Sequence, residues 1–191
     1  MKKRIFIIVI FIIISVILVA LLYFFNTIPH KQYSNSDFNI ETYISSVDKD
    51  NDGIDDQTDI LNNVRTYIAK KPKYKSKYYE TGYPDDEYGV CTDVVANGLK
   101  DAGYDLKELV NEDIINNKEK YNIEVIDKNI DFRRVRNLDV YLKNNSISLT
   151  KDLSQIEEWQ GGDIIVFKDH IGIISDKRNK KGIPFLIHHA N

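Results

Sequence analysis

The sequence has 191 residues, a formal net charge of −3, 42% hydrophobic residues and only four prolines. This length suits one domain of ordinary size with an appendage, and the composition is that of a folded chain. Three cations at positions 2–4 precede an uncharged run, so the remainder carries −3 − 3 = −6. A domain this acidic lacks the positive surface that nucleic-acid binding requires, and a single cysteine excludes an internal disulfide framework.

Residues 5–25 form an uncharged run dominated by Ile, Val, Leu and Phe. A helix of this length, at about 1.5 Å per residue, spans the roughly 30 Å hydrocarbon core of a bilayer. The run is longer than the apolar region of a secretory signal peptide, and no small-residue cleavage site follows it. We therefore expect residues 1–25 to be a single-pass anchor in the cell membrane, with a cleaved signal as the alternative. The cations before the run predict that the chain after it is extracytoplasmic.

Residues 26–47 are predicted to be a linker, and residues 48–59 form an acidic loop, DKDNDGIDDQTD. Asp48, Asp50 and Asp52 at positions 1, 3 and 5, a glycine at position 6 and Asp59 at position 12 follow the pattern of a calcium-binding loop. Aspartate at the last position is shorter than the usual glutamate. The loop is interpreted as a structural Ca²⁺ site or as an acidic turn that caps the next helix.

The hydrophobic pattern of the remaining chain predicts a helical half followed by a sheet. Helices are expected over residues 58–70, 91–102, 106–121 and 137–144. The period then changes, and strands are expected over 164–167, 170–175 and 184–189. The predicted fold class is α+β with an antiparallel sheet.

The only cysteine, Cys91, lies at the start of a predicted helix, where the partial positive charge stabilises a thiolate and lowers the thiol pKa. His170 begins a predicted strand, and His188 and His189 end another. A cysteine at a helix start beside a histidine at a sheet edge suits a thiol hydrolase, in which the imidazole takes the thiol proton. The alternatives are a buried, inert Cys91 and a zinc site, and no closely spaced ligand pair supports zinc.

The motifs GVCTDVV, NIDFRRV, GGDIIVF, HIGIISD and IHH occur in this order between Tyr78 and His189. This order resembles an uncharacterised bacterial domain family related to NlpC-type cysteine peptidases. The resemblance implies a papain-like core, in which a cysteine-bearing helix packs on an antiparallel sheet, and cleavage of peptidoglycan peptides. It also implies Cys91 as nucleophile, His170 as base, and His188 or alternatively His189 as the third catalytic residue. Relatives continue with further strands, so the domain over 58–191 is expected to be truncated at its C-terminal end.

Together these features predict a membrane-anchored, extracytoplasmic cysteine hydrolase that acts on amide bonds in cell-wall peptides without a cofactor. The alternative is a non-catalytic binding or scaffold module with the same fold. Arg133 and Arg134 suit a clamp for a substrate carboxylate. We favour instead a solvated pair or an internal ion pair with Asp131.

Overall fold

The computed structural model describes residues 2–25 and 31–190 of the chain, which divides into two compact units, Met1–Gln32 and Tyr33–Asn191. The first unit contains helix α1, Lys2–Phe24, which is long and apolar enough to cross a membrane and buries none of its side chains. The predicted anchor is therefore a helix of membrane-spanning length. The first part of the predicted linker, residues 26–30, lies outside the described residues.

The second unit combines helices with a three-stranded antiparallel sheet, which confirms the α+β class. The sheet has the order β3-β4-β5, with bounds β3 Ile164–Val166, β4 Ile171–Arg178 and β5 Pro184–Ile187. The central strand β4 supplies Ile171 and Ile173 to the core, both fully buried. Because β4 begins after His170 and β5 ends before His188, both imidazoles project from strand ends.

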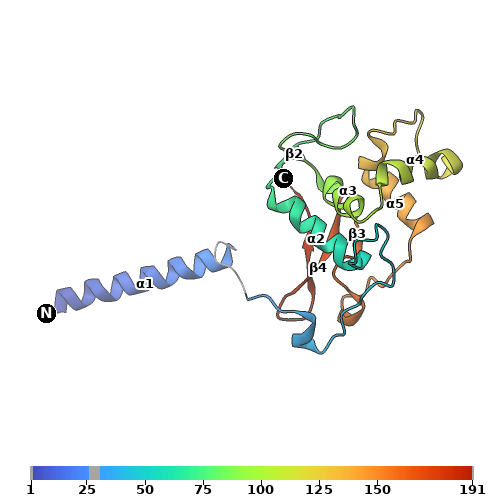
Figure 1. The fold of residues 1–191 in the computed structure, drawn as a ribbon. Coiled ribbons are helices and arrows are strands. Elements are labelled where there is room, and N and C mark those ends of the chain that lie inside the picture. The colour runs from blue at the N-terminus through green and yellow to red at the C-terminus, as the bar shows by residue number, and fades with distance from the viewer. Residues whose placement is uncertain (1, 26–30, 191) are drawn as a thin grey trace. The chain divides into compact units, whose positions relative to one another are not determined.

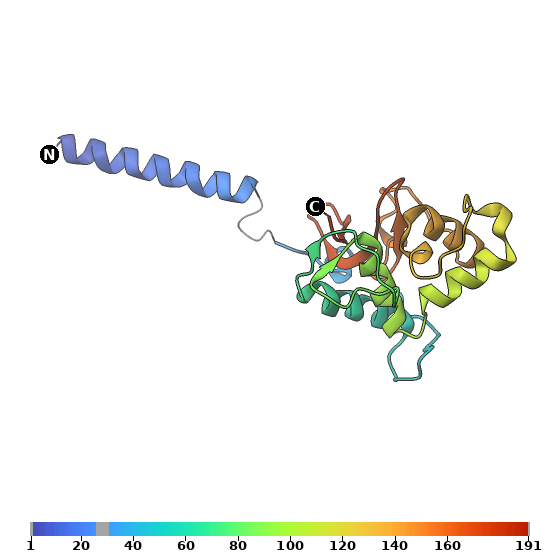
Figure 2. The same cartoon turned by 90° about the horizontal axis from the view of Figure 1, so that it is seen from above.

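Four α-helices of this unit match the predicted helical half, except that the helix that begins at Leu106 ends at Asn116, before the predicted end at residue 121. They are α2 Asp56–Ala69, α3 Cys91–Asp101, α4 Leu106–Asn116 and α5 Val135–Asn145. Short 3-10 helices accompany them: η1 Asn35–Phe38 before α2, η2 Lys118–Lys120 and η3 Asp131–Arg133 between α4 and α5, and η4 Ile156–Glu158 after α5. Helix α3 packs against both α2 and β4, while α4 and α5 form a second group beside it (Figures 1 and 2). The cysteine-bearing helix is thus the most enclosed of these α-helices.

The close packing of α3 on α2 depends on Gly98. A Cβ atom at this position would lie 2.8 Å from Val64 Cγ1, so a larger residue would force the two helices apart. The neighbouring α3 residues Val94 and Val95 are fully buried. Burial of this apolar face holds the start of α3 against the sheet.

A short parallel pair of strands lies in the segment 71–90, which has no predicted strand. Strand β1, Lys73–Tyr74, pairs with β2, Tyr88–Gly89. Two-residue strands are too short for alternation to reveal them in a sequence. The pair lies beside the C-terminal end of the chain in both views (Figures 1 and 2), and the rings of Tyr74 and His189 are 5.1 Å apart.

The chain from Tyr33 onward belongs to the second unit, so the segment expected to be a linker to residue 47 ends earlier. Tyr33 exchanges backbone hydrogen bonds with Arg178, at 2.9 and 2.7 Å. The Arg178 guanidinium, which is 1% exposed, donates to Asn35 Oδ1 at 2.6 Å and to the carbonyls of Ile156 and Gly182. A buried cation requires such acceptors, so Arg178 holds residues 33–35 against β4.

A buried ion pair holds the first turn of α3. Arg133 donates from Nε to Asp93 Oδ1 at 2.7 Å and from Nη2 to Asp93 Oδ2 at 2.9 Å. The two side chains are 2% and 0% exposed. Asp93 Oδ2 also accepts the N–H of Val90 at 2.8 Å, and Arg133 Nη1 donates to the Lys77 carbonyl at 2.7 Å.

Asp131 is the expected partner of Arg133 and Arg134, and the structure pairs it with only one of them. Arg133 pairs with Asp93, and it is Arg134 that pairs with Asp131, at 3.0 Å. Both arginines therefore form internal ion pairs, as favoured, and Arg133 is too buried to clamp a substrate.

We expect Arg133→Met to lower the free energy of unfolding by about 3–5 kcal/mol, because it leaves the Asp93 carboxylate buried without its cation. Arg65→Met is the matched control, since Arg65 and its partner Asp176 are 36% and 34% exposed, and its cost is expected to be about 0–1 kcal/mol. Denaturant unfolding of the full chain in neutral detergent, followed by circular dichroism, measures both. Equal losses in the two variants would contradict this assignment.

Candidate functional site

Cys91 is the first residue of α3, and its side chain is buried at 5% exposure. Burial raises the pKa of the thiol, while the backbone N–H groups of Ile171, Thr92 and Cys91 itself act in the opposite direction. The helix start therefore favours the thiolate, as expected, but burial outweighs it. The predicted net lowering of the Cys91 pKa is wrong, because it took the helix start into account and not the sheet that covers it.

The sulfur of Cys91 lies against the beginning of β4, since the N–H of Ile171 is among the groups that stabilise its charge. His170 directly precedes Ile171, and its Nε2 is 2.9 Å from His188 Nδ1 at the end of β5. Burial, followed by the charge of His188, lowers the pKa of His170. The thiol and the two imidazoles are thus gathered around the start of β4.

Gly172 allows the two histidines to approach each other. A Cβ atom at this position would lie 2.8 Å from the Ile187 carbonyl oxygen and 3.1 Å from His188 Cβ. The strand end that carries His188 could not take its present place beside a larger residue.

The histidine that contacts His170 is His188, and His189 lies elsewhere. The His189 ring packs edge-on against Tyr74, and its Nδ1 is buried without a hydrogen-bond partner among the described residues. Within residues 2–25 and 31–190, no hydrogen bond joins the Cys91 sulfur to an imidazole nitrogen. The structure therefore assembles a histidine pair next to the thiol without linking the two.

Two tyrosines beside Cys91 are not among the predicted site residues. Burial and then the charge of Cys91 raise the pKa of Tyr74. Tyr67 Oη lies against Gly89, just before the α3 start, and like His189 Nδ1 it is buried with no partner within the described ranges. Nothing in the sequence marks these two among its twelve tyrosines, because their position depends on the packing of α2 and β1. Unsatisfied polar atoms are uncommon in a core and are expected beside a polar ligand.

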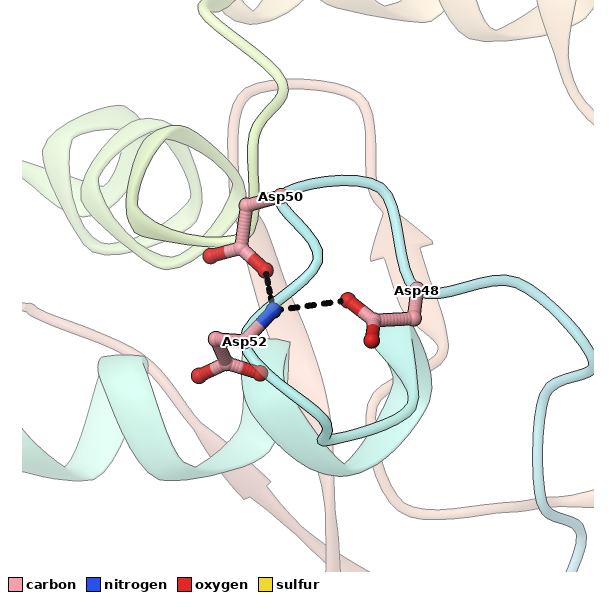
Figure 3. Close-up of side chains that lie close together, drawn as sticks. All are labelled: Asp48, Asp50 and Asp52. Atoms are coloured by element: carbon pink, nitrogen blue, oxygen red, sulfur yellow. Dashed lines mark hydrogen bonds between the residues drawn. The ribbon is translucent and has the colours of Figure 1, made fainter.

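The acidic loop brings together three of its four predicted ligands. Carboxylate oxygens of Asp48, Asp50 and Asp52 lie within 4.8 Å of one another, and the Asp48 and Asp50 carboxylates converge on the backbone N–H of Asp52 (Figure 3). The N–H of Asp52 donates to both other carboxylates at 3.2 Å, and the N–H of Gly53 donates to Asp48 at 3.0 Å. Gly53 has a φ of 93°, which suits the sharp turn that calcium loops make at their sixth position.

The fourth predicted ligand, Asp59, is not part of this group. It lies in the first turn of α2 and is 7% exposed. Burial raises the pKa of Asp59, and the charges of Asp52 and Asp50 add to this. The loop also has the helix-capping role of the alternative interpretation, because the Asp55 side chain accepts the N–H of Thr58 at the start of α2.

We expect His188→Ala to raise the pKa of His170, because the variant removes the charge that disfavours a second imidazolium nearby. In the wild type, the pKa of His170 should lie below the ordinary 6.5, as burial and His188 both lower it. A ¹H–¹³C NMR titration of the imidazole Cε1–H groups measures this. His189→Ala is the matched control, and a similar rise in that variant would show that the His170–His188 contact has no such effect.

Comparisons with known proteins give a family. Residues 61–191 match the family described as Domain of unknown function (DUF1287). The chain is 32% identical over 142 residues to the uncharacterized protein YijF of Escherichia coli (strain K12), which covers 68% of this chain and 69% of that protein. No solved structure matches the chain. The family match extends over Cys91, His170 and His188 and over more than half of the sequence, and the chain therefore belongs to the DUF1287 family.

Proposed function

We propose that this protein is a membrane-anchored thiol hydrolase that cleaves amide bonds, with Cys91 as nucleophile, His170 as base and His188 as the residue that orients the base. The observation that carries the proposal is the 2.9 Å contact between His170 Nε2 and His188 Nδ1 beside the buried Cys91 thiol. A nucleophile, a base and a third group behind the base are the parts that thiol hydrolysis needs. The relationship to NlpC-type peptidases with a papain-like core is part of this proposal.

The protonation states support His170 as the base. Burial keeps the Cys91 thiol protonated at neutral pH, since it raises the thiol pKa, while the lowered pKa of His170 keeps that imidazole neutral. When His170 Nε2–H donates to His188 Nδ1, the remaining nitrogen of His170, Nδ1, has a free lone pair. This nitrogen can accept the thiol proton. Such hydrogen bonds are often long in a free enzyme and tighten only when substrate binds.

The reaction then follows in two stages. The thiolate attacks the amide carbon, and the backbone N–H of Cys91 at the start of α3 donates to the oxygen that becomes negative. His170 gives its proton to the leaving amine, which leaves a thioester on Cys91. A water molecule that loses a proton to His170 attacks this thioester, releases the acid and restores the thiol.

The substrate class that we propose is the peptides of peptidoglycan. Two observations support it. Helix α1 with its N-terminal cations favours an extracytoplasmic domain, where such peptides occur. Tyr67 Oη, buried without a partner among the described residues just before the start of α3, is a further polar atom that a bound peptide could engage.

The test uses the full chain in neutral detergent with soluble muropeptides, and mass spectrometry detects the products. We expect wild-type protein to cleave an amide bond. Cys91→Ala should abolish turnover, and His170→Ala should lower it by about 10²–10⁴-fold, because a positioned general base contributes that much. His189→Asn is the control, expected to keep most of the activity. Circular dichroism checks that each variant is folded.

One outcome would favour the alternative function. If muropeptides bind to the wild type and to Cys91→Ala with equal affinity and neither protein cleaves them, the domain is a binding module and the hydrolase proposal is wrong.

We also propose that the acidic loop binds a structural Ca²⁺ through Asp48, Asp50 and Asp52. The grouped carboxylates and the left-handed Gly53 fit this ion, which takes six to eight oxygen ligands in a flexible shell. Water molecules and backbone carbonyl groups would supply the remaining ligands. The ion would link the chain before α2 to the start of that helix, and it would have no part in the hydrolysis.

We expect about 5 mM Ca²⁺ to raise the stability of the wild type by about 1–2 kcal/mol, as binding at a Kd of about 10⁻⁴–10⁻³ M requires. Thermal unfolding with Ca²⁺, with Mg²⁺ and with chelator measures this. Asp50→Asn should abolish the stabilisation, whereas Asp85→Asn, an exposed change outside the loop, should preserve it. Absence of any Ca²⁺ effect on the wild type would reject the site.

A further inference from the structure

A large groove lies on the second unit apart from the site around Cys91. It encloses ≈ 970 Å³, and neither Cys91 nor any of the described histidines lines it. Its walls come from the segment 41–47, from the end of α5 with residues 146–149, and from the chain before and within β3. Its volume is at the upper end of the range for small-ligand sites, which is roughly 300–1,000 Å³, so it holds several side chains.

The rim of this groove exposes large apolar side chains from two distant segments. Ile44 is 69% exposed on one side, and Ile147 is 86% exposed on the other. Tyr43, Val47 and Leu149, which are 48–55% exposed, extend the same surface. Single exposed apolar residues are ordinary, but five that line one groove mark an interaction surface.

The charge of the groove has one sign. All five charged residues that line it are acidic, although the chain has 26 basic and 29 acidic residues in total. Asp56 and Asp163 have internal partners, among them the Tyr104 hydroxyl and the Gln57 amide. The other three, Glu41, Glu157 and Glu158, are exposed and form no ion pair within residues 2–25 and 31–190. A cationic ligand is therefore favoured, and an anionic membrane surface is repelled.

The backbone of both walls indicates a peptide. The N–H and C=O groups of Ile44 have no hydrogen-bond partner in the described part of the chain, and the same holds for residues 147–149. The N–H groups on either side of Ile44 are held, Tyr43 by Gln160 at 3.2 Å and Ser45 by Asp55 at 2.9 Å. A wall that is held on both sides of Ile44 and has free peptide groups can form main-chain hydrogen bonds with an added segment.

We propose that this groove binds a peptide segment of a partner protein that carries lysine or arginine side chains next to apolar ones. The apolar side chains of the segment would cover Ile44 and Ile147, and its cations would pair with Glu157 and Glu158. The surface is separate from the thiol site, so the proposal holds whether or not the protein is a hydrolase.

The test measures binding of an acetylated and amidated hexapeptide of alternating lysine and leucine to the full chain in neutral detergent. Isothermal titration calorimetry, with a blank titration into detergent alone, gives the affinity. We expect the wild type to bind this peptide at least tenfold more tightly than the peptide in which glutamate replaces lysine. Equal affinity for the two peptides, or no binding of the lysine peptide, would overturn the proposal.

Variants locate the binding. The double variant Glu157→Lys and Glu158→Lys should weaken binding at least tenfold, and so should Ile147→Ser. The matched controls lie outside the groove: Glu119→Lys, an exposed charge reversal, and Val125→Ser, at a residue that is 80% exposed, should leave the affinity unchanged. If Ile147→Ser fails to fold, the double charge variant still tests whether the peptide binds in the groove. Equal losses of affinity in the groove and control variants would mean that the peptide binds elsewhere and would overturn the proposal. If the chain self-associates without peptide and Ile147→Ser abolishes this self-association, the groove binds a second copy of the chain instead.

Discussion

The buried charge of Asp93 is the constraint on which the arrangement around Cys91 depends. This carboxylate is fully buried two residues after the thiol, so it requires the Arg133 guanidinium and cannot exchange it for water. Its second oxygen holds the N–H of Val90, which directs the chain into α3. On its other side the same guanidinium holds the Lys77 carbonyl, which ties the tyrosine-rich loop to η3. One ion pair therefore positions the turn that carries Cys91, the loop in front of it and the segment behind it.

The same burial determines the chemistry that the site can perform. A thiol in the first turn of a helix is usually a candidate for a preformed thiolate. Here the sheet covers the helix start, and both burial and the Asp93 charge raise the Cys91 pKa. A thiol that is protonated at rest needs a base at the moment of reaction. The lowered pKa of His170 suits that task, and the contact with His188 leaves one imidazole nitrogen free for it.

The second unit has two surfaces of different character. The site at the start of β4 combines the buried Cys91 thiol with the half-buried His170 and the exposed His188. The groove between residues 41–47 and the end of α5 is open, apolar and acidic. Buried Arg178 holds the N-terminal segment that leads into this groove, through Asn35 and Tyr33. Substrate chemistry and partner binding would therefore occupy separate surfaces of a single unit.

The local pattern of the sequence was enough to predict α1 to α5 and the three strands of the meander. Their apolar period is a property of neighbouring residues, and the spacing of Asp48, Asp50 and Asp52 likewise predicts a grouping within one loop. Proximity of Cys91 to the start of β4 followed from the motif order together with the resemblance.

Only the tertiary structure decided which groups meet across the fold. It paired Arg133 with Asp93 where the sequence suggested Asp131, and it brought His188 rather than His189 to His170. It also left Asp59 out of the loop cluster and buried Cys91 deeply enough to reverse the expected direction of its pKa. The physical reason is the same in each case. Ion pairing, ring contacts and desolvation depend on segments far apart in the chain, whereas the hydrophobic period records only which face of each segment is buried.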